Sequence, residues 1–160
     1  MDAGDDREYS RQPRPEDLAK ICAALNREGA RYLRIGGFAV IAYGLERPTK
    51  DIYFLIDASP ENVERVKRAL AVLPDNAVRD VSADEVGRYE VVRVADEVVV
   101  DLMAKACGIT WEEAASDSEI LELDGVEIPI VGIDTLIRTK LTVRPHDAAD
   151  RIPGQELRLS

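Results

Sequence analysis

Apolar and polar positions alternate along the 160-residue chain in a way that predicts helices and strands in mixed order. Apolar residues recur at helical spacing over 16–28, and an apolar strand follows at Tyr32–Ile35. Asp51–Ile56 consists mostly of strand formers and predicts a buried strand. Ser59 in front of a proline is a typical helix cap, which predicts a helix over Pro60–Leu70. The first half of the chain therefore alternates between helix and strand.

The second half predicts two hairpins and two helices, after a polar, irregular stretch at 75–87. Asp124-Gly125 between two apolar runs is the strongest hairpin signal in the chain. The predicted elements are strands 89–94 and 97–102 joined at Ala95-Asp96, a helix 110–115 capped by Thr110, strands 120–123 and 126–130, and a helix 133–143. This order predicts a single α/β (α+β) domain over 16–160 with a mixed, twisted sheet, preceded by a flexible lead-in over 1–15.

Composition and charge narrow the range of functions. No apolar run reaches the roughly 20 residues of a membrane helix, and the polar N-terminus is not a secretory signal. Cys22 and Cys107 lie in apolar surroundings, and reduced core cysteines favour a cytoplasmic protein. The net charge of −10 argues against extended contact with duplex DNA. It leaves room for a nucleotide, because a single phosphate site needs few local donors.

Two aspartates are candidates for the chemistry. Asp51 opens an apolar strand, where a lone carboxylate more often points into water or caps a turn through Thr49. Asp101 ends another apolar strand, and a carboxylate in such surroundings is costly unless it is paired or metal-bound. If the two strands ran antiparallel, the end of one would lie beside the start of the other and the carboxylates would converge. Mg²⁺ (or Mn²⁺) would suit such a pair, together with phosphate oxygens.

Gly36-Gly37 lies between the predicted strand Tyr32–Ile35 and an apolar segment at 38–43 that predicts a short buried helix. Glycines at such a junction let the backbone approach a ligand, and a helix N-terminus offers N–H groups to phosphate. A tight strand-to-helix turn is the better explanation of the pair when it is considered alone.

Taken together, these segments resemble the polymerase-beta-like nucleotidyltransferase superfamily. They are most similar to its small prokaryotic members, including those related to toxins of type IV toxin–antitoxin systems. The family pattern is a strand ending in Gly-Gly or Gly-Ser, a helix, an R-x-T-x-D-h-D strand (h being apolar) and a later aspartate on an apolar strand. The matching residues are Gly36, Gly37, Arg47, Thr49, Asp51 and Asp101, and the likeness runs over 32–150. The resemblance implies a nucleotidyltransferase fold.

Position 53 departs from this pattern, because Tyr53 stands where the family has its second strand carboxylate. In the family, the paired aspartates hold two magnesium ions that bind the triphosphate and activate the acceptor hydroxyl. A neutral phenol is a poor magnesium ligand. Position 53 therefore marks a site that is damaged, altered or deliberately mutated.

Two functions follow as expectations. The first is Mg²⁺-dependent transfer of an NMP from an NTP to a hydroxyl acceptor, which would be a small molecule, a protein or an RNA end. Asp51 and Asp101 would bind the metal, and Gly36-Gly37 would hold the triphosphate. The second is a nucleotide- or partner-binding pseudoenzyme, one component of a toxin–antitoxin pair with a cognate protein partner. A structural α/β domain with incidental aspartates is the third alternative.

Three basic side chains complete the candidate nucleotide site. Arg47 and Lys50 flank the strand that begins at Asp51, and Lys140 lies on the late predicted helix. Each could contact a phosphate group. The simpler explanations are a charged loop for the first two residues and a solvated surface lysine for the third.

Overall fold

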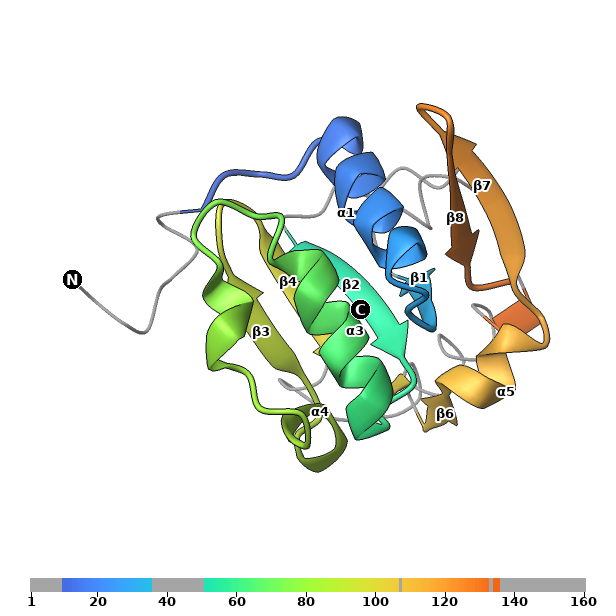
Figure 1. Ribbon diagram of the computed structural model, residues 1–160. Helices are drawn as coiled ribbons and strands as arrows, with labels where there is room; N and C mark the ends of the chain where they lie inside the picture. The colour runs from blue at the N-terminus through green and yellow to red at the C-terminus, as the bar shows by residue number, and fades with distance from the viewer. Residues whose placement is uncertain (1–9, 36–50, 107, 133, 136–160) are drawn as a thin grey trace, which may run out of the picture.

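A mixed six-stranded sheet, ordered β3-β4-β2-β1-β8-β7, organises the chain (Figure 1). The computed structural model describes residues 10–35, 51–106, 108–132 and 134–135. The sheet strands are β1 (Tyr32–Ile35), β2 (Asp51–Ile56), β3 (Val92–Ala95), β4 (Val99–Met103), β7 (Glu119–Leu123) and β8 (Val126–Ile130). The other elements are α1 (Pro15–Arg27), α3 (Pro60–Leu70), a 3-10 turn η2 (Ala77–Asp80), α4 (Glu85–Arg88), α5 (Trp111–Ala115) and a small ladder of β5 (Lys105–Ala106) with β6 (Ile109–Thr110). The predicted α+β fold class is confirmed.

Helix α1 begins at a start signal in its sequence. Pro15 occupies the first turn, where its missing N–H costs no hydrogen bond, and Asp17 accepts from the backbone N–H of Arg14 at 2.7 Å. Apolar residues at helical spacing are buried on one side: Leu18, Ala19, Ile21, Cys22, Ala24 and Leu25. Burial raises the pKa of the Cys22 thiol to about 12, which keeps it protonated. Cys107 lies outside the described residues.

Helix α3 is fixed by the cap predicted from Ser59-Pro60. The hydroxyl of Ser59 accepts a hydrogen bond from the backbone N–H of Asn62 at 3.4 Å. Asn62 is itself fully buried, and its side chain bonds the backbone N–H and C=O of Arg31 and the C=O of Asp57. One buried amide thus joins the helix to the ends of β1 and β2.

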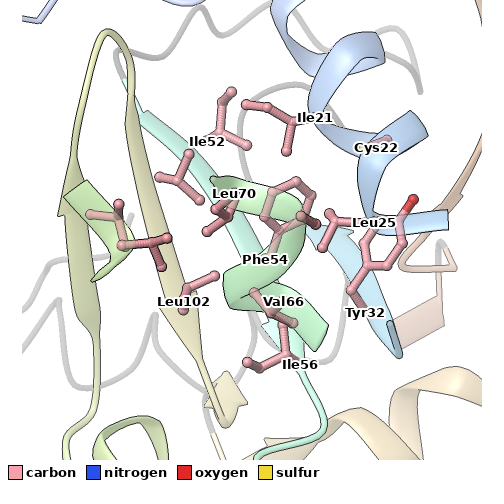
Figure 2. Packing of buried hydrophobic residues seen from close by; sticks show 14 of the residues in the cluster. Ile21, Cys22, Leu25, Tyr32, Ile52, Phe54, Ile56, Val66, Leu70 and Leu102 are labelled. Carbon is pink, nitrogen blue, oxygen red and sulfur yellow. The ribbon is translucent and has the colours of Figure 1, made fainter. Parts of the chain in front are cut away.

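Helices α1 and α3 lie side by side over one face of the sheet, and the main core fills the space beneath them (Figures 1 and 2). Phe54 of β2 is at its centre, with its ring edge-on to that of Tyr32 at a centroid distance of 5.4 Å. Ile21 and Leu25 of α1 and Leu70 of α3 surround it. Burial raises the pKa of the Tyr32 phenol, whose hydroxyl donates to Asn26 at 2.9 Å.

Both predicted hairpins are present, but the first one turns at 96–98 and not at the predicted Ala95-Asp96, because Ala95 is the last residue of β3 and pairs with Val99. Asp124 and Gly125 have φ of 53° and 79°, as a two-residue hairpin turn requires, and β7 pairs antiparallel with β8 around them. Strands β3 and β4 also pair antiparallel, across a turn at 96–98. The stretch 75–87, which the sequence predicts to be irregular, contains η2 and the first three residues of α4. Asp96 contributes to this order, because its buried carboxylate accepts from the backbone N–H groups of Asp75 and Ala77.

Strand β2 pairs parallel with β4, so the antiparallel pairing considered from the sequence is wrong. The reason lies in the connection between them. Helix α3 returns the chain along the sheet, and the segment 72–91 then runs back again before β3 begins on the far side of β4, level with Phe54 near the end of β2. The β3–β4 turn reverses direction once more, which leaves β4 parallel to β2.

Hydrogen bonds hold both ends of the described chain in place. Arg11 bonds both carboxylate oxygens of Asp17 at 2.6 Å, and its backbone N–H donates to the carbonyl of Glu97 beside the β3–β4 turn. At the other end, Asp117 accepts from the backbone N–H and the hydroxyl of Thr135, where a helix begins. The rest of the helix predicted over 133–143 lies outside the described residues. No helix in the described part of the chain has the length and apolarity to cross a membrane.

Candidate functional site

Three side chains with polar chemistry form a row across adjacent strands on the sheet face opposite α1 and α3. Tyr53 of β2 is the register partner of Asp101 of β4, and Asp101 is in turn the partner of Arg93 of β3. Register partners project to the same face of a sheet. The structure therefore places Asp101 between Tyr53 and Arg93.

Asp101 is completely buried and ion-paired. The Nε of Arg93 lies 3.0 Å from its Oδ1, and the Nη2 of Arg93 lies 3.3 Å from its Oδ2. This is the two-point geometry in which a guanidinium binds a carboxylate most strongly. The Arg93 side chain remains 41% exposed. The carboxylate that the sequence identified as needing a partner thus has an arginine partner.

Arg93 was missed by sequence reasoning, although a signal for it exists. It belongs to the polar set of a strand that reads apolar at Val92 and Val94, and the register of a hairpin turning at 96–98 places it opposite Asp101. Opposite charges directly across an antiparallel ladder are a common stabilising pair.

A second missed residue, Arg34 of β1, holds the backbone of this region. Its guanidinium is fully buried and donates through Nη1 to the carbonyl of Tyr53 at 3.0 Å and to that of Ile35. Burial lowers the pKa of Arg34 to about 9, so the group stays protonated at neutral pH. Because Arg34 lies under α1, it fixes Tyr53 from the core side of the sheet.

The backbone of Asp51 lies opposite Val99, two residues before the Tyr53–Asp101 pair on the parallel ladder. The two predicted metal ligands are therefore offset along neighbouring strands, and do not sit at adjoining strand ends. Only the backbone of Asp51 belongs to the described structure, so the approach of its carboxylate to Asp101 stays a prediction.

The remaining predicted site residues lie outside the described part of the chain: Gly36, Gly37, Arg47, Thr49, Lys50 and Lys140. Strand β1, which precedes the two glycines in the sequence, is described. Its last residue, Ile35, is the register partner of Tyr53, so β1 ends directly beside the row of polar side chains.

An apolar cluster borders the polar row on the same face. Leu33 and Leu55 of the sheet pack with Val131, and with Ile109 and Ala114 from the β6–α5 segment. This cluster covers the part of β1 and β2 that lies beyond Tyr53. It leaves the beginning of β2 and the middle of β4 as the polar region of the face.

Asp101 and Tyr53 stand where a two-magnesium centre would need ligands. Such a centre needs carboxylate oxygens free to approach each ion to about 2.1 Å. Asp101 has both oxygens bound by Arg93, and Tyr53 offers a phenol in place of a carboxylate. Within the described residues, no three His, Cys, Asp or Glu side chains are grouped as a metal site. Tyr53, Asp101 and Arg93 do not fit a two-metal centre.

Comparisons with known proteins agree with this fold. No protein-family model matches the chain, and no curated protein matches it. Among solved structures, it is similar to the crystal structure of a putative nucleotidyltransferase (TM1012) from Thermotoga maritima. The TM-score is 0.61 at 19% sequence identity, over 87% of this chain and 91% of that one. At this identity the likeness is one of fold. The chain therefore has a nucleotidyltransferase fold.

Proposed function

We propose that this protein is a nucleotide-binding member of the nucleotidyltransferase fold that does not carry out two-metal nucleotidyl transfer. One observation carries the proposal: Asp101 is held at both oxygens by Arg93, while its neighbour on β2 is Tyr53. Two-metal transfer depends on ions that bridge carboxylates and phosphates. A buried carboxylate already neutralised by a guanidinium is a poor anchor for such an ion.

Three features support nucleotide binding. The fold is similar to that of the putative nucleotidyltransferase from Thermotoga maritima. Gly36-Gly37 follows β1 at the point where its last residue pairs with Tyr53. Arg47 and Lys50 bring positive charge into the segment before β2, although the chain as a whole is acidic. We propose that these residues, with Lys140, contact the phosphates of an NTP.

Transfer of an NMP to a hydroxyl acceptor, with Mg²⁺ or Mn²⁺ on Asp51 and Asp101, is the competing function. The similarity to a nucleotidyltransferase favours it. The Arg93–Asp101 pair argues against it, because a metal would have to displace or compete with the guanidinium. A cognate protein partner, as in a toxin–antitoxin pair, is compatible with the binding function and stays a proposal.

Calorimetry with each of the four NTPs, in EDTA and in MgCl₂, tests binding, and intact-mass spectrometry after incubation tests transfer. We expect binding of at least one NTP and no nucleotidyl adduct on protein or added acceptors. Gly37→Val should abolish binding, because its side chain would fill the space of a phosphate. Gly87→Ala is the matched control, because a methyl group there meets no atom within 4 Å. Magnesium-dependent adducts would establish the transferase instead, and no binding of any NTP would remove the nucleotide site.

A further inference from the structure

We propose that Arg93 is a built-in cation that takes the place of a divalent metal at Asp101, so that phosphate groups bind this face without a metal ion. The phosphate part of this inference rests on the proposed function. The part that concerns the cation rests on the described side chains alone.

The geometry of the pair carries the inference. Arg93 and Asp101 are direct register partners on antiparallel strands, so their backbones are fixed by the ladder on both sides of the contact. The two hydrogen bonds, at 3.0 and 3.3 Å, engage both carboxylate oxygens. A metal on either oxygen would be brought close to the guanidinium, and two cations at that distance repel.

Tyr53 contributes from the other side of Asp101. The phenol is half-buried and carries no charge at neutral pH, whereas a carboxylate at position 53 would add a negative charge beside Asp101. This face is therefore less negative than one with carboxylates at positions 53 and 101 and no arginine. Arg93 adds a positive charge, and Tyr53 does not add the negative charge of a carboxylate. Arg93 and Tyr53 shift the site in the same direction, towards anions and away from divalent cations.

The exposure of Arg93 indicates which ligand would use it. Its partner is completely buried, yet its own side chain is 41% exposed. Because a guanidinium carries five N–H donors, an exposed arginine that binds a carboxylate can also contact phosphate oxygens. The ligand class is therefore a polyphosphate, and for the proposed function a nucleoside triphosphate.

The effects of Arg93 and Tyr53 on metal binding at Asp101 also depend on each other. A carboxylate introduced at position 53 alone would stand beside an Asp101 that is already neutralised. Removal of Arg93 alone would take the guanidinium from Asp101 but leave a phenol next to it. Only both changes together give two adjacent carboxylates on β2 and β4 that Arg93 does not neutralise.

Manganese binding tests the cation part, with MnCl₂ as the probe and no nucleotide present. Electron paramagnetic resonance counts bound Mn²⁺ in the parent, Tyr53→Asp, Arg93→Gln and the double variant. We expect the double variant to gain one saturable site at least about tenfold tighter than anything in the parent, with a rise in melting temperature on adding the metal. Arg88→Gln is the matched control, because it removes an arginine paired with Asp84 on α4. Tyr53→Asp alone gaining the full site would overturn the proposal.

A measurement on the parent protein keeps the test decisive if Arg93→Gln does not fold. Mn²⁺ broadens the amide resonances of residues near its binding site. We expect surface carboxylates to broaden first, and the amides of Tyr53 and Asp101 to stay sharp at the same Mn²⁺ concentration. Early, selective broadening of these two amides would show that metal binds beside Arg93 and would overturn the proposal.

The phosphate part is tested by ATP titration in EDTA. We expect binding by the parent without metal, and at least about tenfold weaker binding by Arg93→Gln but not by Arg88→Gln. Binding that strictly requires magnesium would refute the metal-free site. If the parent bound no NTP at all, the proposed function would fail, while the manganese results would still decide the role of Arg93.

Discussion

Arg93 and Asp101 are directly opposed on β3 and β4, and they differ sharply in exposure: the carboxylate is completely buried, while the guanidinium side chain is 41% exposed. The exposed member of the pair therefore satisfies the buried one. Removing the arginine takes an ion-pair partner from a buried charge in an apolar strand, whereas removing the carboxylate leaves an arginine that water can solvate. This asymmetry predicts that the two single substitutions lower the free energy of unfolding by different amounts.

We expect Arg93→Ala to lower the free energy of unfolding by about 3 kcal/mol. Asp101→Asn should cost less, because a buried amide is cheaper than an unpaired buried charge. The double variant should be no less stable than Arg93→Ala alone. Urea denaturation of the four proteins measures this cycle. Equal losses for the two single variants would contradict the asymmetry.

Gly132 lies against the backbone of Asp117, and a Cβ there would come within 1.8 Å of the Asp117 carbonyl oxygen. Because a backbone atom cannot give way like a flexible side chain, we expect Gly132→Ala to cost more than about 2 kcal/mol. Gly87→Ala is the control. It meets open space in α4 and should stabilise by about 0.5–1 kcal/mol. Thermal and urea melts distinguish the two variants, and a neutral Gly132→Ala would show that this approach is not needed.

Asp96 organises the turn before β4 by accepting three backbone hydrogen bonds, from Asp75 at 2.9 Å, Ala77 at 2.8 Å and Glu97 at 2.7 Å. We expect Asp96→Ala to destabilise the protein by about 2–3 kcal/mol, because buried N–H groups lose their acceptor. Asp96→Asn keeps one oxygen and should lose less. Hydrogen exchange at Ala77 should accelerate in both variants, and unchanged exchange there would contradict the assigned role.

Acid stability should depend on Asp17. The hydrogen bond from Arg11 lowers the pKa of its carboxyl below the ordinary 3.8. A depressed carboxyl pKa contributes stability that is present in full above the unfolded value and is lost as the pH falls through the folded one. We expect Asp17→Asn to flatten the fall in stability below about pH 4, in melts recorded from pH 7 to pH 2. Glu64→Gln, an exposed change of equal charge, should leave that slope unaltered.

Most of the elements could be predicted from sequence because they are determined locally. Ser59-Pro60 and Asp124-Gly125 fix a helix start and a hairpin turn within a few residues of themselves, and both occur as expected. The direction of β4 relative to β2 could not be predicted this way. This direction depends on how many times the segment 57–98 reverses its course along the sheet. The residues within the two strands carry no information about that number.

The candidate site was predictable in part for the same reason. The embedding of Asp101 between Val100 and Leu102 indicates that it needs a partner, but the identity of that partner depends on register. Arg93 is identified as this partner only when the position of the β3–β4 turn is known. Arg34 gave no local signal, since a single arginine in a short strand is ordinarily a surface residue.

The parallel contact between β1 and β8, where Arg34 is the partner of Ile130, has a consequence for how the chain is made. Strand β1 lies inside the sheet, yet one of its two neighbours is synthesised almost a hundred residues later. Until the β7–β8 hairpin leaves the ribosome, β1 presents an open edge to other nascent chains. Long-range closure of this kind slows folding. Completion of the sheet therefore waits for the β7–β8 hairpin to be synthesised, and we expect the nascent chain to be most prone to aggregation before that point.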